Sequence, residues 1–177
     1  MRILTLTVVI MMIWMIPVAQ AQNTVALNQD APVIDISNIQ QVRLMAELEL
    51  GNAGDVQWSP DGRRIAIAAH TAVHIYQTFD MTADPLVIDF GAAIFDIAFD
   101  PGGLQLAVST RQGFEADGSQ TADTTPLPTL HLISVIDGSI LTQELVSAYD
   151  LDFNTDGSKI AFVGLTDDQE QTVNLWN

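Results

Sequence analysis

The stretch DVQWSPDGRRIAIAAH, residues Asp55–His70, decides how the fold of this chain is interpreted. A four-residue turn, Ser-Pro-Asp-Gly, lies between two apolar runs. Pro60 stands at the second position, which a type I turn favours, and Gly62 stands where a left-handed residue closes a bulged hairpin. The run IAIAA after the turn has no polar face. It therefore predicts a strand that other parts of the protein cover on both sides.

The same pattern occurs three times in the chain. An Asp, an aliphatic residue, any residue and an aromatic residue precede a turn that ends in Gly. The copies are DVQWSPDG (55–62), DIAFDPGG (96–103) and DLDFNTDG (150–157). The first two copies are 41 residues apart and the next two 54, with the extra residues inside the polar stretch 111–128. A period of about 40–45 residues is that of a four-stranded propeller blade. We assign structural turn roles to Pro60, Asp61, Gly62, Pro101, Gly102, Gly103, Asp156 and Gly157.

Strand patterns fill each repeat, and helical periodicity is weak after the N-terminal apolar run. In the first repeat we expect strands over 64–69, 72–76 and 86–90, after the one that carries Asp55. The prediction is an all-β fold of three propeller blades of four antiparallel strands, at about 42–90, 91–145 and 146–177. A two-sheet sandwich is the competing fold, but it does not predict a recurring turn motif.

These residues resemble a known family. The segments VQWSPDGRRIAIAA, AVHIY and TVNLWN are similar to WD40 repeats, and IQQVRLMAELEL (39–50) resembles the lead-in segment of exported bacterial WD40 proteins. That resemblance implies that 39–50 supplies the outer strand of the last blade. The Gly-His and Trp-Asp dipeptides of the family are missing, and TolB-like propellers, which share the turn, are a near alternative.

Three blades are fewer than the four to eight that close a propeller. Three explanations stay open. The chain is the N-terminal part of a longer propeller, or two chains associate to complete a ring, or the blades form an open arc with exposed edges.

The N-terminus has the pattern of a secretory signal. Arg2 precedes an apolar run over 3–16, and Ala19-Gln20-Ala21 offers a signal peptidase site, so we expect cleavage after Ala21. The expected organisation is a signal peptide (1–21), a leader (22–38) and the blades (39–177). We expect an extracellular or periplasmic protein with no stable membrane insertion after cleavage, because 14 apolar residues are short for a span.

Composition excludes several classes of partner. With 22 acidic and six basic residues the formal net charge is −16, which argues against nucleic acid and anionic membranes. The chain has no cysteine, so disulfides and thiolate sites are excluded.

Two groups of residues are candidate sites. Asp55, Asp96 and Asp150 begin the inner strand of each blade, where a ring of carboxylates could hold a cation such as calcium. The alternative is that each carboxylate accepts hydrogen bonds from local backbone. In the stretch 111–128, Arg111 and Phe114 are candidate partner-binding residues, and the alternative is a tolerated loop.

No catalytic motif is present in the sequence, and we expect no cofactor, no firm metal site and no enzyme activity. His74 and His131 hold equivalent places in two repeats, which favours a structural role over a metal site. The leading hypothesis is an exported, non-enzymatic interaction scaffold with a protein partner. The alternatives are a fragment of a propeller hydrolase and a propeller that binds a cation or small ligand.

Overall fold

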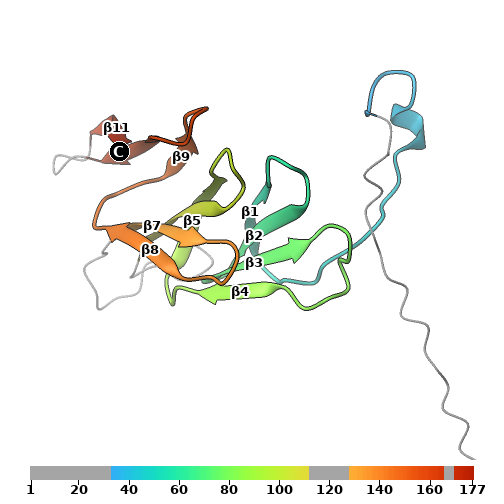
Figure 1. The fold of residues 1–177 in the computed structure, drawn as a ribbon, viewed down its shortest axis with the longest axis horizontal. Helices are drawn as coiled ribbons and strands as arrows, with labels where there is room; N and C mark the ends of the chain where they lie inside the picture. The colour runs from blue at the N-terminus through green and yellow to red at the C-terminus, as the bar shows by residue number, and fades with distance from the viewer. Residues whose placement is uncertain (1–32, 112–127, 166–169) are drawn as a thin grey trace, which may run out of the picture.

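The computed structural model describes residues 33–111, 128–165 and 170–177, which form three antiparallel sheets side by side (Figure 1). We call these sheets blades 1, 2 and 3. Blade 1 contains β1 (Ala53–Trp58), β2 (Arg64–Ala69), β3 (Ala72–Gln77) and β4 (Leu86–Asp89). Blade 2 contains β5 (Ala93–Phe99), β6 (Gln105–Arg111), β7 (Pro128–Ser134) and β8 (Ile140–Glu144). Blade 3 contains β9 (Asp150–Phe153), β10 (Ile160–Leu165) and β11 (Gln171–Trp176).

Each blade is a meander in which consecutive strands pair, in the orders β1-β2-β3-β4, β5-β6-β7-β8 and β11-β10-β9. The predicted all-β fold with partial propeller architecture is confirmed, and the expected strand 64–69 is β2 itself. Residues Ile39–Gln41 form a single 3-10 turn, η1. In the described ranges no helix combines the length and apolar character that a membrane span needs.

The three recurring turns have one geometry. At the first turn position, a short polar side chain accepts a hydrogen bond from the backbone N–H that opens the next strand. The pairs are Ser59 with Arg64 (2.9 Å), Asp100 with Gln105 (2.6 Å) and Asn154 with Lys159 (2.9 Å). The closing residues Gly62, Gly103 and Gly157 have φ of 68°, 67° and 72°, which only glycine adopts without strain. Local turn chemistry therefore sets the hairpin at the start of every blade.

The middle strands lie between two apolar layers, which explains the opening stretch. Ala66 and Ala68 of β2 face blade 2, in a buried cluster with Ile97 of β5 and Val108 of β6. A second cluster joins blade 2 to blade 3, and Ile67 on the opposite face of β2 belongs to a third. The small alanine side chains allow the neighbouring sheet to approach closely, as the apolar pattern predicted.

The lead-in segment takes a different place from the one that the resemblance implied. Residues 42–50 form no strand in the described structure and run along the outer side of blade 1. Leu48 and Leu50 pack there against Ile67, Tyr76 and Met81. The segment therefore covers part of the first blade, and no pairing with blade 3 is present among the described residues.

Candidate interaction surfaces

Two of the three predicted channel carboxylates, Asp55 and Asp96, make a repeated contact between blades. Oδ2 of Asp55 on β1 accepts a hydrogen bond from the backbone N–H of Ile97 on β5, at 3.3 Å. Oδ2 of Asp96 on β5 accepts one from the N–H of Leu151 on β9, at 2.6 Å. Each donor directly follows the Asp of its own blade. One carboxylate per blade therefore fixes the inner strand of the next blade.

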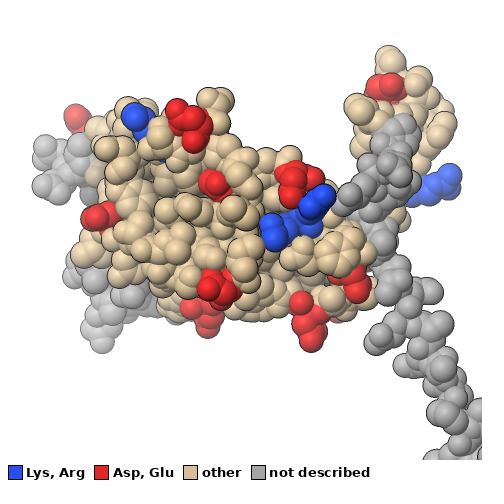
Figure 2. Space-filling model, in the orientation of Figure 1, with Lys and Arg blue, Asp and Glu red and all other residues tan. Residues whose placement is uncertain are grey.

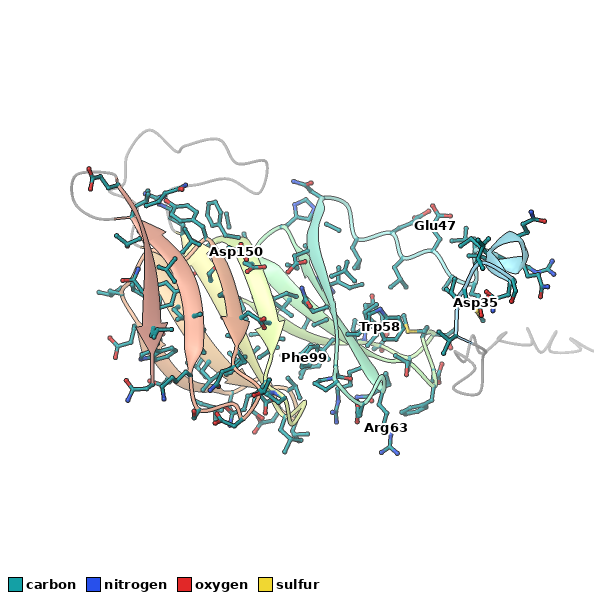
Figure 3. The ribbon with its side chains drawn as sticks, turned by 90° about the horizontal axis from the view of Figure 1, so that it is seen from above. Asp35, Glu47, Trp58, Arg63, Phe99 and Asp150 are labelled. Atoms are coloured by element: carbon teal, nitrogen blue, oxygen red, sulfur yellow. The ribbon has the colours of Figure 1, made fainter. Side chains whose placement is uncertain are left out.

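This series of contacts is open at both ends. The Asp150 side chain lies on an exposed position of β9 (Figure 3), and no residue of the described ranges donates a hydrogen bond to its carboxylate. At the other end, no blade precedes β1 in the described ranges, and the N–H of Val56 donates to Oδ1 of its own Asp55, at 2.7 Å. An unused acceptor thus lies on blade 3, and the matching donor position lies on blade 1.

Burial is the main cause that raises the pKa of Asp96 to about 7; the hydrogen bond from the Leu151 N–H opposes this rise and the nearby Asp55 carboxylate adds to it. Asp96 therefore carries a proton for part of the time at neutral pH. Among the described residues no group of three or more His, Asp or Glu could hold a metal ion. Asp55 and Asp96 bind backbone donors, and cation binding by the three carboxylates stays a prediction.

The turns repeat a second contact between blades. A β-carbon at Gly103 would lie 3.4 Å from Cδ of Pro60, and one at Gly157 would lie 3.3 Å from Cδ of Pro101. The proline of one turn therefore packs on the closing glycine of the next. Gly62 of blade 1 has open space at the same position. At the blade 1 end, therefore, no residue of the described ranges packs on the closing glycine, Gly62.

The outer face of blade 3 is apolar and exposed to solvent. The strand registers place Val173 of β11 at the position of Val73 on β3 and Leu130 on β7. Val73 and Leu130 are 0% exposed because the next blade covers them, whereas Val173 is 77% exposed. Its neighbour Leu175 is 69% exposed.

The outer face of blade 1 is also apolar, and the part that Leu48 and Leu50 leave uncovered is exposed. Val56 on β1 corresponds to Ile97, and Trp58 corresponds to Phe99 (Figure 3). Val56 and Trp58 are 49% and 52% exposed, while Ile97 and Phe99, which face blade 1, are 0% and 8% exposed. The two end faces of the row of blades are therefore the uncovered halves of one repeated interface. We call them the blade 1 end face and the blade 3 end face.

Of the two residues predicted to bind a partner, the structure describes Arg111. Arg111 is the last residue of β6, and its guanidinium donates to the Tyr149 hydroxyl and lies 5.6 Å from the Tyr149 ring centroid. Tyr149 in turn makes an edge contact with Phe95 at 5.5 Å. Arg111 therefore joins blade 2 to the start of blade 3, and the sequence analysis missed Tyr149. Phe114 lies outside the described residues, and partner binding by both residues stays a prediction.

Much of the acidity belongs to the turns. Seven aspartates accept a hydrogen bond from the backbone N–H two residues further on: Asp35, Asp61, Asp80, Asp89, Asp100, Asp137 and Asp156. Hydrogen bonds from nearby backbone and hydroxyl groups hold the pKa of Asp35, Asp61, Asp80, Asp89, Asp137 and Asp156 below the usual range. Figure 2 shows acidic side chains scattered over the visible face, with few basic ones among them. This distribution is that of turn-forming residues.

Comparisons with known proteins support the fold class. No model of a protein family and no curated protein matches the sequence. Among solved structures, the chain is similar to the WD40 domain of coronin from Toxoplasma gondii (TM-score 0.55, 12% identity), covering 70% of this chain and 30% of that one. It is also similar to the uncharacterized protein lmo1340 from Listeria monocytogenes EGD-e (TM-score 0.51, 12% identity, 70% and 36% covered). A eukaryotic initiation factor structure is matched at a TM-score of 0.45 and 22% identity, with 71% and 29% covered.

At these identities the likeness shows the fold alone. The chain spans about a third of the length of these solved structures. The class that the fold defines is therefore a WD40-like β-propeller, of which the described residues form three successive blades.

Proposed function

We propose that this chain is an exported, non-enzymatic interaction module whose end faces bind protein. The observation that carries the proposal is the blade 3 end face, where Val173 and Leu175 are more than two-thirds exposed at positions that are covered in a complete interface. Exposed contiguous apolar surface marks interaction sites in soluble proteins. The WD40-like fold is compatible with this assignment, but one fold hosts many functions, so the assignment is argued from the exposed face.

The shape of this face favours a protein ligand over a small molecule. Its groove runs along the three strands of blade 3, has a volume of about 190 Å³, and is lined by Asp150, Leu151, Asp152, Ala161, Phe162, Val163 and Val173. Small-molecule pockets are usually about 300–1,000 Å³ and concave. In the described structure β11 pairs on one side with β10 and has no strand on its other side. Such an edge offers backbone donors and acceptors to an added strand.

The environments of two of the three histidines, His70 and His131, support a role without catalysis. Nε2 of His131 lies 2.9 Å from the Thr110 hydroxyl, and its ring packs against Phe90 at 4.8 Å between blades. Nε2 of His70 accepts the Asn52 N–H at 3.2 Å. Both rings therefore take part in packing or loop closure. The proposal of export rests on the signal pattern of the sequence, which lies outside the described residues.

Photocrosslinking in the producing cells tests the proposal. A photoreactive residue is placed at Leu175 in one variant and at Ile136 in another, because Ile136 on blade 2 is similarly exposed, at 63%, and lies away from the end faces. We expect protein adducts from position 175 and none from position 136. No adduct from position 175 would overturn the proposal.

A further inference from the structure

We infer that the protein covering the blade 3 end face is a second copy of this chain, whose blade 1 end face docks head to tail. This inference rests on the proposed function, since it names the partner of the same surface. Each copy would present its blade 3 to the blade 1 of the other. The complete set of contacts comes from interfaces that the chain already makes within itself.

The hydrogen-bond series identifies the docking atoms. Asp55 and Asp96 each bind the N–H of the residue after the next blade's Asp. The same rule applied to Asp150 requires an N–H after an inner-strand Asp, and Val56 of a second copy supplies it. In the isolated chain that N–H turns to its own Asp55. The unused donor and acceptor therefore match each other.

The apolar residues at the two ends are complementary in the same way. Val73 on β3 is fully buried in a cluster with Ile97 of the following blade. Val173 holds the position of Val73, and Val56 holds the position of Ile97. Placing the second copy's blade 1 on blade 3 would bring these two exposed residues into an equivalent cluster. Burial of apolar surface is the main driving force for such association.

The lead-in segment is positioned to pair with β11. In blades 1 and 2 the outer strands β4 and β8 end seven and six residues before the next inner-strand Asp. Residues 45–50 lie at a similar distance before Asp55. Gly51 and Gly91 both have positive φ, 73° and 60°, at the end of these segments.

The side chains in front of the two glycines also correspond. Leu48 and Leu50 pack inward, as Ile88 and Phe90 do before Gly91. Because Val73 lies opposite Ile88 in the β3–β4 pair, the expected register places Val173 opposite Leu48 of the second copy. The unpaired segment of one copy would thus complete the three-stranded blade of the other.

A second copy also fits the number of blades and the turn contacts. Two sets of the three described blades make six, within the four to eight that close a propeller. The open space at Gly62 would receive the second copy's Thr155, which stands where Pro60 and Pro101 stand in their turns. A head-to-tail interface closes into a ring when its rotation allows it. Because each copy carries a formal charge of −16, we expect added salt to strengthen the association.

The test is the molar mass of the purified chain by light scattering over a range of protein and salt concentrations. The mass of one chain is 19.2 kDa before the signal peptide is removed. We expect about twice the mass of the single mature chain, with dissociation at low salt. Leu175→Lys should weaken association at least about tenfold, because it places a charge in an apolar contact. Ile136→Lys, at an equally exposed apolar position outside the interface, should associate as the unmodified protein does.

Disulfide trapping tests the head-to-tail geometry. Because the chain has no native cysteine, only the introduced cysteines can form a disulfide. A variant with both Leu48→Cys and Val173→Cys should form a covalent dimer on oxidation, and each single variant should not. A dimer from Val173→Cys alone would overturn the geometry, because it indicates a symmetric contact. So would a mass that grows without limit with concentration, because the ring would not close.

A monomer at all concentrations, or association unaffected by Leu175→Lys, would overturn the inference. The proposed function is judged separately by crosslinking at Leu175. Adducts there with a different protein, or with a further segment of a longer chain, would overturn the second copy and leave the interaction module in place. No adduct at all would overturn both.

Discussion

The carboxylate of Asp96 accepts a 2.6 Å hydrogen bond from the backbone N–H of Leu151, 55 residues later in the chain. The bond joins the inner strand of blade 2 to that of blade 3. Asp55 and Ile97 make the equivalent bond between blades 1 and 2. A repeated Asp therefore acts as a connector between sheets, and within the described residues the third one, Asp150, has no next blade to bind.

Asp96 should make the stability of the protein depend on pH. Its pKa in the folded protein is about 7, above the ordinary 3.8, so the folded state keeps a proton that the unfolded chain has lost. Its stabilising contribution is fully present below about pH 4 and is lost as the pH rises through about 7. Thermal unfolding of the unmodified protein and Asp96→Asn, compared from pH 5 to 7.5, measures it. The advantage of Asp96 over Asn should shrink as the pH rises.

The comparison with Asp96→Asn is needed because His131 changes the stability of the folded protein with pH in the opposite direction. Burial lowers the pKa of His131, so its contribution is lost as the pH falls below about 6.5. Asp84→Asn is the control, since Asp84 is the same residue type at an exposed position outside the strands. A pH profile that is identical in the unmodified protein and Asp96→Asn would contradict this account of Asp96.

The closing glycines should differ in their tolerance of a side chain. Gly62→Ala and Gly157→Ala both place a β-carbon on a left-handed residue, which costs about 1–2 kcal/mol. Gly157→Ala also presses on Pro101 of the neighbouring blade, while Gly62→Ala meets open space within one chain, so both substitutions are compared in the Leu175→Lys background, which favours the single chain. Urea denaturation should therefore give a larger loss of unfolding free energy for Gly157→Ala. Equal losses would show that the turns do not pack on each other.

Arg111 and Tyr149 should be energetically coupled. The guanidinium contacts both the hydroxyl and the ring face of Tyr149 across the blade 2–blade 3 boundary. A double-mutant cycle with Arg111→Ala and Tyr149→Phe should give a coupling of about 0.5–1.5 kcal/mol in unfolding free energy. Additive losses would instead favour the sequence-based hypothesis that Arg111 acts on a partner.

Much of the fold could be predicted from the sequence, because its determinants are local. Pro60 and Gly62 specify a turn through their own backbone preferences, and the unbroken apolar run of β2 predicts cover on both sides. Both features recur with a fixed period, which identifies the blade. The bounds of β2 matched the prediction for this reason.

The contacts between blades could not be predicted from local sequence patterns. Asp96 meets Leu151 because of the stagger between two sheets, and nothing near Asp96 in the sequence encodes that stagger. The place of residues 42–50 also depends on whether another blade is present to pair with them. Tyr149 carried one available signal, since it directly precedes the third repeated Asp.

The N-terminal signal gives a prediction that is independent of the fold. Mass spectrometry of the protein recovered from the periplasm or medium should show a mature N-terminus at Gln22, because Ala19 and Ala21 fit the signal peptidase site. Replacing Ala21 by a bulky residue should leave the precursor uncleaved. Intact Met1 in the recovered protein would contradict the predicted processing.

The central claim is that the two end faces are the two halves of one interface. Hydrogen–deuterium exchange at increasing protein concentration tests it most directly, because it reports which backbone becomes protected. We predict that protection rises together in residues 171–176 and 45–58, while exposed β8 at 140–144 stays unchanged. Exchange in both end segments that is fast and independent of concentration would contradict the claim.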